Sequence, residues 1–237
     1  MCATIRRNSG PSPRADDPRV LRTRSAVAAA ARTLFLEQGY AGTTMEEIAA
    51  AAGVTRRTLY NNYADKETLF VGIVAEVGSY ADAFAHGVRE ELGAGITAAT
   101  LRAALDGLGR RLALGIVRPE VIAIRRLLIG EARTFPALAQ TYFVRAPGQV
   151  IAELAASFRR LDRAGLLRVP DARRAAGQFA YLVAGELLDR GVLMGTLPPR
   201  ARIVAGAREG VKTFLARYRA PARNASAAAK NCSGASR

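Results

Sequence analysis

The segment from Thr44 to Phe70 constrains the fold more than any other part of the chain. Thr44, followed three residues later by Glu47, has the pattern of a capping box, in which two side chains satisfy amide donors that a first helical turn leaves unpaired. Gly53 suits the left-handed conformation that often follows a helix end, because it carries no side chain. The pattern predicts a short helix from Thr44 to about Ala52, followed by a glycine turn.

A second short helix is expected from Thr55 to about Asn62. Thr55 can cap its start, and Val54 and Leu59 stand at the positions of a hydrophobic staple, which fixes the angle at which the chain enters a helix. Asp65 then offers a cap for a third helix. Two short capped helices joined by a glycine turn are typical of a helix-turn-helix motif that binds DNA.

The second helix of this motif carries donors and amides on its outward face, which suit phosphates and the edges of bases in the major groove. These residues are Arg56, Arg57, Thr58, Tyr60, Asn61 and Asn62. Lys66 lies at the expected start of the next helix, where amide dipoles and an ammonium group could hold a phosphate together. Each residue alone would fit an ordinary solvated face, but their ordered succession favours DNA binding.

The segment from Thr23 to Phe70 resembles the N-terminal domain of TetR-family transcriptional regulators. The elements that carry the resemblance are Arg24, Val27, Ala30, Ala31, Leu34, Phe35, Gly39, Tyr40, Thr43, Thr44, Ile48, Ala49, Ala52, Gly53, Val54, Leu59, Tyr60, Tyr63, Lys66, Glu67 and Leu69. The resemblance implies contacts to the DNA backbone from Thr44, Thr55, Tyr60, Tyr63 and Lys66, and a groove-facing position for Arg56, Arg57, Thr58 and Asn61. Arg57, Asn62 and Tyr63 depart from the residues that are frequent there, so the operator sequence does not follow.

Apolar residues recur at helical spacing through the rest of the chain, and no segment alternates with a period of two. We therefore predict an all-α protein of about nine helices, with a three-helix helix-turn-helix domain followed by a helical ligand-binding and dimerisation domain. The first helix is expected from about Arg19 to Gln38, and the helix that Asp65 opens is expected to reach about Glu91. The expected divisions are a disordered arm (1–18), the DNA-binding domain (19–64), the larger helical domain (65–218) and a disordered tail (219–237). Arginines in the arm could follow DNA, or the arm could be a plain tail.

Composition argues against several other functions. The formal net charge of +15 favours an anionic partner, although the basic residues are not concentrated in the first 64 positions. Cys2, Cys232 and His86 lie too far apart for a metal site, and Glu46 and Glu47 diverge around a helix instead of forming a catalytic pair. No phosphate-binding loop or nucleophile motif occurs, so we expect no enzyme activity, no cofactor and no metal. Without an unbroken apolar run of 18 residues or a signal peptide, we expect a soluble cytoplasmic protein with no membrane partner.

The segment from Glu131 to Phe143 resembles the regulatory domain of the AefR-like branch of the family. We expect a small-molecule pocket among apolar residues of this domain, although each of them could also be plain core. The expected lining is Leu105, Leu108, Leu112, Leu128, Phe135, Tyr142 and Phe158.

A homodimer is expected, because one helix-turn-helix motif contacts only a short half of a DNA site. The last two long helices would form the interface, unless their apolar stripes are buried inside one subunit; the residues are Phe179, Leu182, Val183, Gly206, Gly210, Val211 and Phe214. The sequence thus predicts a dimeric regulator, most simply a repressor that a ligand releases from a palindromic DNA operator. A TetR-type activator and a helical protein-interaction module without ligand response are the alternatives. The ligand and the controlled genes do not follow from the sequence.

Overall fold

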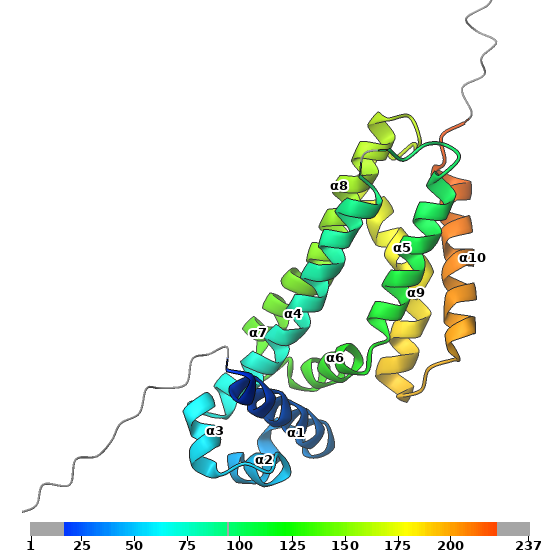
Figure 1. Cartoon of the computed structure of the whole chain (residues 1–237). Helices are drawn as coiled ribbons and strands as arrows, with labels where there is room; N and C mark the ends of the chain where they lie inside the picture. The colour runs from blue at the N-terminus through cyan, green and yellow to red at the C-terminus, as the bar shows by residue number, and fades with distance from the viewer. Residues whose placement is uncertain (1–16, 94, 222–237) are drawn as a thin grey trace, which may run out of the picture. The chain divides into compact units, whose positions relative to one another are not determined.

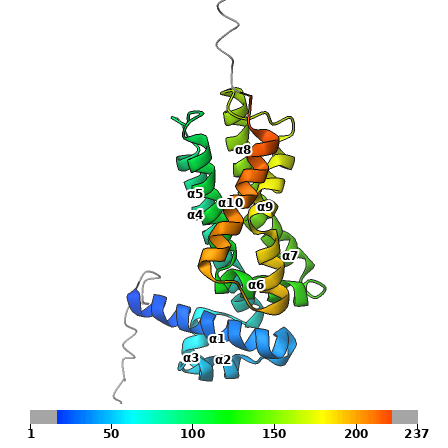
Figure 2. The same cartoon turned by 90° about the vertical axis from the view of Figure 1, so that its right-hand side faces the viewer.

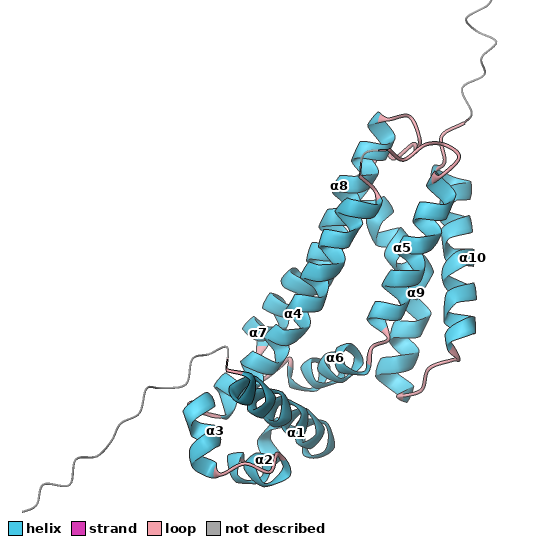
Figure 3. Cartoon of the chain, viewed as in Figure 1, coloured by secondary structure: helices cyan, strands magenta, loops and turns pink. Residues whose placement is uncertain are grey.

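The fold is all-α, as predicted, in a computed structural model that describes residues 17–93 and 95–221 (Figures 1 and 3). The helices in the described part of the chain are α1 (Pro18–Gly42), α2 (Met45–Ala51), α3 (Arg56–Asn62), α4 (Lys66–Glu91), α5 (Leu101–Ile116), α6 (Pro119–Glu131), α7 (Pro136–Phe143), the π-helical stretch η1 (Val144–Gly148), α8 (Gln149–Arg163), α9 (Ala172–Met194) and α10 (Arg200–Tyr218). Because α7, η1 and α8 follow one another without a break, these segments make nine continuous helical runs.

The chain divides into two compact units. The first contains residues 1–76 and 123–139, and the second contains residues 77–122 and 140–237. The polypeptide passes between the units inside α4, α6 and α7, so each of these three helices contributes to both. Most of the expected arm (1–16) and tail (222–237) lies outside the described residues.

The first unit begins with α1, which starts at Pro18, close to the predicted Arg19. Asp17 caps it by accepting a hydrogen bond from the amide of Arg19 at 2.8 Å. Gly39, the expected end, adopts φ 76° and kinks the helix, which then resumes as far as Gly42. Val27, Ala31 and Phe35 form its buried stripe, as expected from their spacing.

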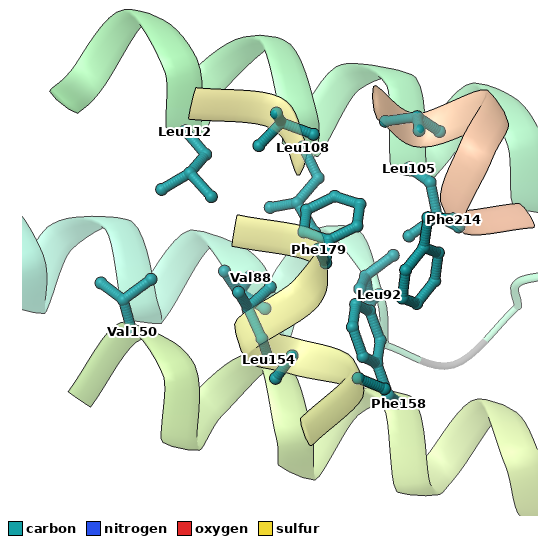
Figure 4. Close-up of a cluster of buried hydrophobic side chains, with 14 of the residues drawn as sticks. Val88, Leu92, Leu105, Leu108, Leu112, Val150, Leu154, Phe158, Phe179 and Phe214 are labelled. Carbon is teal, nitrogen blue, oxygen red and sulfur yellow. The ribbon is translucent and has the colours of Figure 1, made fainter. Parts of the chain in front are cut away.

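The second unit packs its helices around one apolar core. In this unit α5, α9 and α10 pack against one another and α8 packs on α9 (Figures 1 and 2). Phe158, Phe179 and Phe214 form an aromatic cluster at the centre, with ring centroids 5.0–5.5 Å apart (Figure 4). The leucines of α5 complete this core, together with apolar side chains from the second half of α4.

Pro147 lacks an N–H, which can kink or break a helix, yet the helical run continues through it to Val150. The backbone widens into the π-helical stretch η1 around this proline and continues directly into α8. A π-helical turn accommodates a residue that cannot make the regular hydrogen bond, so the helical run continues.

Of the helices that the structure describes, only α4 is long and apolar enough to cross a membrane, judged by length and composition. Leu69, Phe70 and Ile73 of this helix are buried in the first unit, and Ala85 and Val88 in the second. Its apolar character is therefore explained by packing against both units.

Candidate nucleic-acid interface

Helices α2 and α3 form the predicted helix-turn-helix pair. The amide of Thr44 donates to Glu47 Oε2 at 2.8 Å, and the amide of Glu47 donates to Thr44 Oγ1 at 3.2 Å, which completes the capping box. The hydrogen bonds that the Thr44 hydroxyl and amide donate to Glu47 Oε2 lower the pKa of this carboxyl. Gly53 adopts φ 66° in the turn, and Leu59 anchors α3 with a fully buried side chain.

The outward face of α3 presents three side chains that make no hydrogen bond or ion pair within the described part of the chain. These are Arg57, Tyr60 and Asn61, all exposed. A guanidinium, a phenol and an amide on one short helix can contact phosphates and base edges without first breaking an internal bond. Of the ten predicted DNA contacts, these three are the most available.

Arg56 is also exposed but already has a partner. Its guanidinium forms an ion pair with Glu46, which α2 contributes. The pair joins the two helices of the motif at their surface. Because both side chains are well exposed, the pair is weak and could exchange for a contact with DNA.

Three hydroxyl-bearing residues of the predicted contact set have local structural roles. Thr44 and Thr55 cap α2 and α3, and the hydroxyls of Thr55 and Thr58 lie 2.8 Å apart. Tyr63 is half-buried, and this burial raises the pKa of its phenol, with Glu76 adding to the effect. Thr44 and Thr55 remain exposed, whereas Thr58 and Tyr63 are partly buried.

Asn62 faces another protein side chain. Its amide donates to the Thr58 carbonyl at 2.8 Å, and its oxygen accepts a hydrogen bond from Arg24 Nε at 3.2 Å. Arg24 comes from α1 and was not among the predicted contacts. Its position 38 residues earlier in the chain gave no local signal for this pairing. The structure thus adds an exposed cation beside α3.

Lys66 braces the junction between α1 and α4. Its ammonium donates to the carbonyls of Tyr40 and Thr43, both at 2.8 Å, and lies 4.4 Å from the centre of the Tyr40 ring. Two of its three donors are therefore occupied by main-chain oxygens. The helix start and the kinked end of α1 share this side chain, and the contact of its third donor with a phosphate stays a prediction.

Aromatic side chains pack together beside the junction between α1 and α4. The rings of Phe35, Tyr40, Phe70 and Phe135 lie in mutual contact, with centroids 4.7–5.6 Å apart. Glu131 Oε1 accepts a hydrogen bond from the Tyr40 amide at 3.1 Å. Burial raises the pKa of the Tyr40 phenol, and the nearby carboxylates of Glu67, Asp65 and Glu131 raise it further. The segment around Glu131 and Phe135 thus belongs to the DNA-binding unit.

Residues 27–73, which span this unit from α1 to the start of α4, match the family described as bacterial regulatory proteins, tetR family. Residues 103–220 match the AefR-like transcriptional repressor C-terminal domain. The chain belongs to the TetR family. It is a DNA-binding regulator that resembles the repressors of this family.

Known relatives agree with this assignment. A TetR-family transcriptional regulator from Mesorhizobium loti MAFF303099 is 28% identical, covers 86% of this chain and all of its own, and superposes with a TM-score of 0.72. The flavonoid-responsive regulator FrrA is 32% identical over 84% of this chain and 97% of its own, with a TM-score of 0.59. The curated repressor BepR from Brucella suis biovar 1 (strain 1330) is 44% identical over 52 residues, 22% of this chain, and this match spans only 25% of BepR.

The ligand pocket predicted for this TetR-family chain draws on two different units. Leu105, Leu108, Leu112 and Phe158 lie together in the core of the second unit, with Tyr142 packed against it (Figure 4). Leu128 and Phe135 belong to the first unit, where Phe135 contacts Tyr40 and Phe70. The structure therefore brings five of the seven residues together and separates two.

The predicted dimer residues are mostly buried within one subunit. Phe179, Val183, Val211 and Phe214 are at most 3% exposed, so a partner cannot reach them while the core is closed. Their apolar side chains, which were expected to form an interface, are buried inside the subunit. Gly210 lets α10 approach the Leu182 carbonyl of α9 in the same chain. Only Leu182 and Gly206 are exposed.

Proposed function

We propose that this TetR-family regulator is a homodimeric repressor that binds a palindromic DNA operator and leaves it when a small molecule binds the second unit. The observation that carries the DNA-binding part is the exposed face of α3, where Arg57, Tyr60 and Asn61 have no partner among the described residues. A soluble cytoplasmic location fits a regulator of this kind, and we propose it together with the function.

Release by a ligand requires an affinity difference between two conformations. Suppose that a ligand binds one conformation more tightly by about 1–3 kcal/mol, and that in this conformation the two helix-turn-helix motifs are poorly placed for DNA. Such a ligand would lower operator affinity about 5–150-fold. Helices α4 and α6 each run through both units, so a shift in the second unit would reach the first along continuous backbone. The responsiveness of FrrA to flavonoids supports a small-molecule effector.

The test is selection of DNA from a random duplex pool by the purified full chain. We expect an enriched palindrome, because two-fold symmetry of the protein imposes two-fold symmetry on its site. Recovery of no preferred sequence at low salt would contradict the proposal and would favour a helical protein-interaction module.

Arg57→Ala provides the residue-level test on the selected site. We expect specific affinity to fall by about 1–3 kcal/mol if the guanidinium makes a bidentate base contact, with little change in unfolding, since Arg57 has no internal partner. Arg173→Ala removes an equal charge from an exposed position of α9 and serves as the matched control. Equal losses for the two variants would mean that Arg57 contributes only net charge.

A further inference from the structure

An arginine in the second unit has a guanidinium edge without a partner. Arg111 of α5 uses its Nη1 for an ion pair with Glu91 Oε1 of α4 at 2.5 Å. Its Nε and Nη2 are shielded from solvent and have no hydrogen-bond partner. Glu91 Oε2 is likewise buried without a partner. Buried polar atoms are nearly always paired, so the two free donors of Arg111 point to a missing acceptor.

The two free donors have a defined geometry. Nε–H and Nη2–H lie on the same edge of the planar guanidinium and point in parallel, so they can hold both oxygens of one carboxylate. Glu91 already occupies the opposite end of the group. The free edge therefore matches an acceptor with two oxygens in one plane.

The surroundings hold the guanidinium in place. Its Cζ lies 5.4 Å from the centre of the Phe84 ring, and a methyl group at Gly87 would lie only 3.0 Å from Nη1. The bare backbone at Gly87 thus leaves the space that the guanidinium fills. Because its rotation is restricted before any ligand arrives, binding would cost little side-chain entropy.

The neighbouring side chains are apolar. Val88 and Leu112 follow Gly87 and Arg111 in their helices, and both are buried in the core of the second unit (Figure 4). Phe84 offers a ring beside the charge. The apolar surface shown next to the guanidinium is therefore the Phe84 ring, on which a ligand that placed an anion at Arg111 could rest.

We propose that Arg111 anchors the carboxylate of an aromatic organic acid, and that such an acid is the class of effector that this regulator senses. The inference rests on the proposed function, in which a small molecule binds the second unit. Phe84 and Gly87 position the guanidinium, and Glu91 holds its other end. The acid accepts hydrogen bonds from Nε and Nη2.

The experiment titrates the full chain with sodium benzoate, and with benzamide as the neutral probe of the same shape, by ligand-observed NMR. We expect benzoate to bind at least about tenfold more tightly than benzamide, since a hydrogen-bonded charge pair replaces a neutral contact. Inorganic phosphate forms a third arm. Absent benzoate binding, equal affinity for benzamide, or tighter binding of phosphate would overturn the proposal.

Variants locate the site. Arg111→Met should weaken benzoate binding at least about tenfold, whereas Arg110→Met, which removes the same charge from the exposed neighbour on α5, should leave it unchanged. Glu91→Gln should strengthen binding, because it removes a negative charge that repels the acid's carboxylate, while the amide oxygen can still accept from Nη1. If Arg111 only supports the fold, Glu91→Gln should weaken benzoate binding instead of strengthening it. Weaker binding by this variant would overturn the proposal, even if Arg111→Met failed to fold.

Retention of the same samples on DNA without benzoate keeps the two proposals apart. DNA binding that persists while benzoate fails to bind would overturn only the acid site. Loss of salt-dependent DNA binding would instead overturn the proposed function, whatever benzoate does.

Discussion

The ammonium group of Lys66 lies between two main-chain carbonyls and the ring of Tyr40, so its replacement should act first on stability. Lys66→Met keeps the apolar stem and removes the charge. We expect the free energy of unfolding to fall by about 1–3 kcal/mol, because the carbonyls of Tyr40 and Thr43 lose a charged donor. Denaturant titration of the variant and of the parent chain measures this difference.

The salt dependence of DNA binding separates this brace from a phosphate contact. A lost phosphate contact would flatten the slope of log affinity against log salt by about one unit. For Lys66→Met we expect weaker binding with an unchanged slope, because the helix-turn-helix motif is displaced while no counterion-releasing contact is removed. A slope flatter by one unit, with stability intact, would restore Lys66 as a phosphate ligand.

The role of a residue could be predicted where its partner lies only a few positions away in the sequence. The caps of α2, α3 and α4 pair residues three positions apart, as in Thr44 with Glu47, and such spacing is visible in the sequence. Arg24 with Asn62 and Lys66 with Tyr40 join residues 38 and 26 positions apart, and no local pattern marks them. Of the predicted outward face of α3, Arg56, Arg57, Tyr60 and Asn61 are exposed, whereas the internal partners of the flanking residues could not be predicted.

Among the helices, the crossing of α9 and α10 depends on one missing side chain. A methyl group at Gly210 would overlap the Leu182 carbonyl and crowd the amide of Val183 at 3.0 Å, and both are rigid backbone atoms. We expect Gly210→Ala to destabilise the chain by about 1–3 kcal/mol through overpacking, despite the better helix propensity of alanine. Thermal unfolding followed by circular dichroism measures the change.

Gly107 in α5 provides the matched control, since nothing lies within 4 Å of a methyl group added there. Gly107→Ala should stabilise the chain by up to about 0.5–1 kcal/mol, because alanine is the better residue in a helix interior. Equal effects of the two substitutions would mean that α10 does not approach α9 as closely as the structure has it.

The helices themselves were the most predictable level of organisation. Capping residues and apolar stripes marked the starts of α2, α3 and α4 in advance, because a helix is built from contacts three and four residues apart. Gly39 interrupts α1 with a non-helical conformation, as glycine at a helix end does, whereas at Pro147 the helical run continues as the π-helical stretch η1.

At the scale of the whole molecule, contacts between distant segments determine which faces are buried, and these contacts could not be predicted from the sequence. Residues 123–139 join the DNA-binding unit through Glu131 and Phe135, and the apolar stripes of α9 and α10 turn inward to meet α5. A stripe reports only that one face of a helix is buried. It does not say whether the same subunit or a partner covers that face, so the predicted dimer residues fell largely in the core.

The proposed homodimer, if it pairs through α9 and α10, would use what remains exposed on these helices. Tyr181 and Leu182 of α9 are 69% and 43% exposed, and Gly206 of α10 has open space around it. A stable contact buries about 1,200–2,000 Å², so these residues would form its centre, with neighbouring polar groups around them.

Leu182→Glu tests this face, because a buried carboxylate without a partner is costly on both sides of a two-fold interface. We expect the parent chain to be a dimer by sedimentation and the variant a monomer with much weaker binding to the selected palindrome, since one helix-turn-helix motif then holds only one half-site. Ile129→Glu places the same charge at an apolar residue of α6 that is 67% exposed, and it should remain a dimer. A dimeric Leu182→Glu protein would require the subunits to meet on another surface, and the spacing of the two half-sites would then have to be set by different helices.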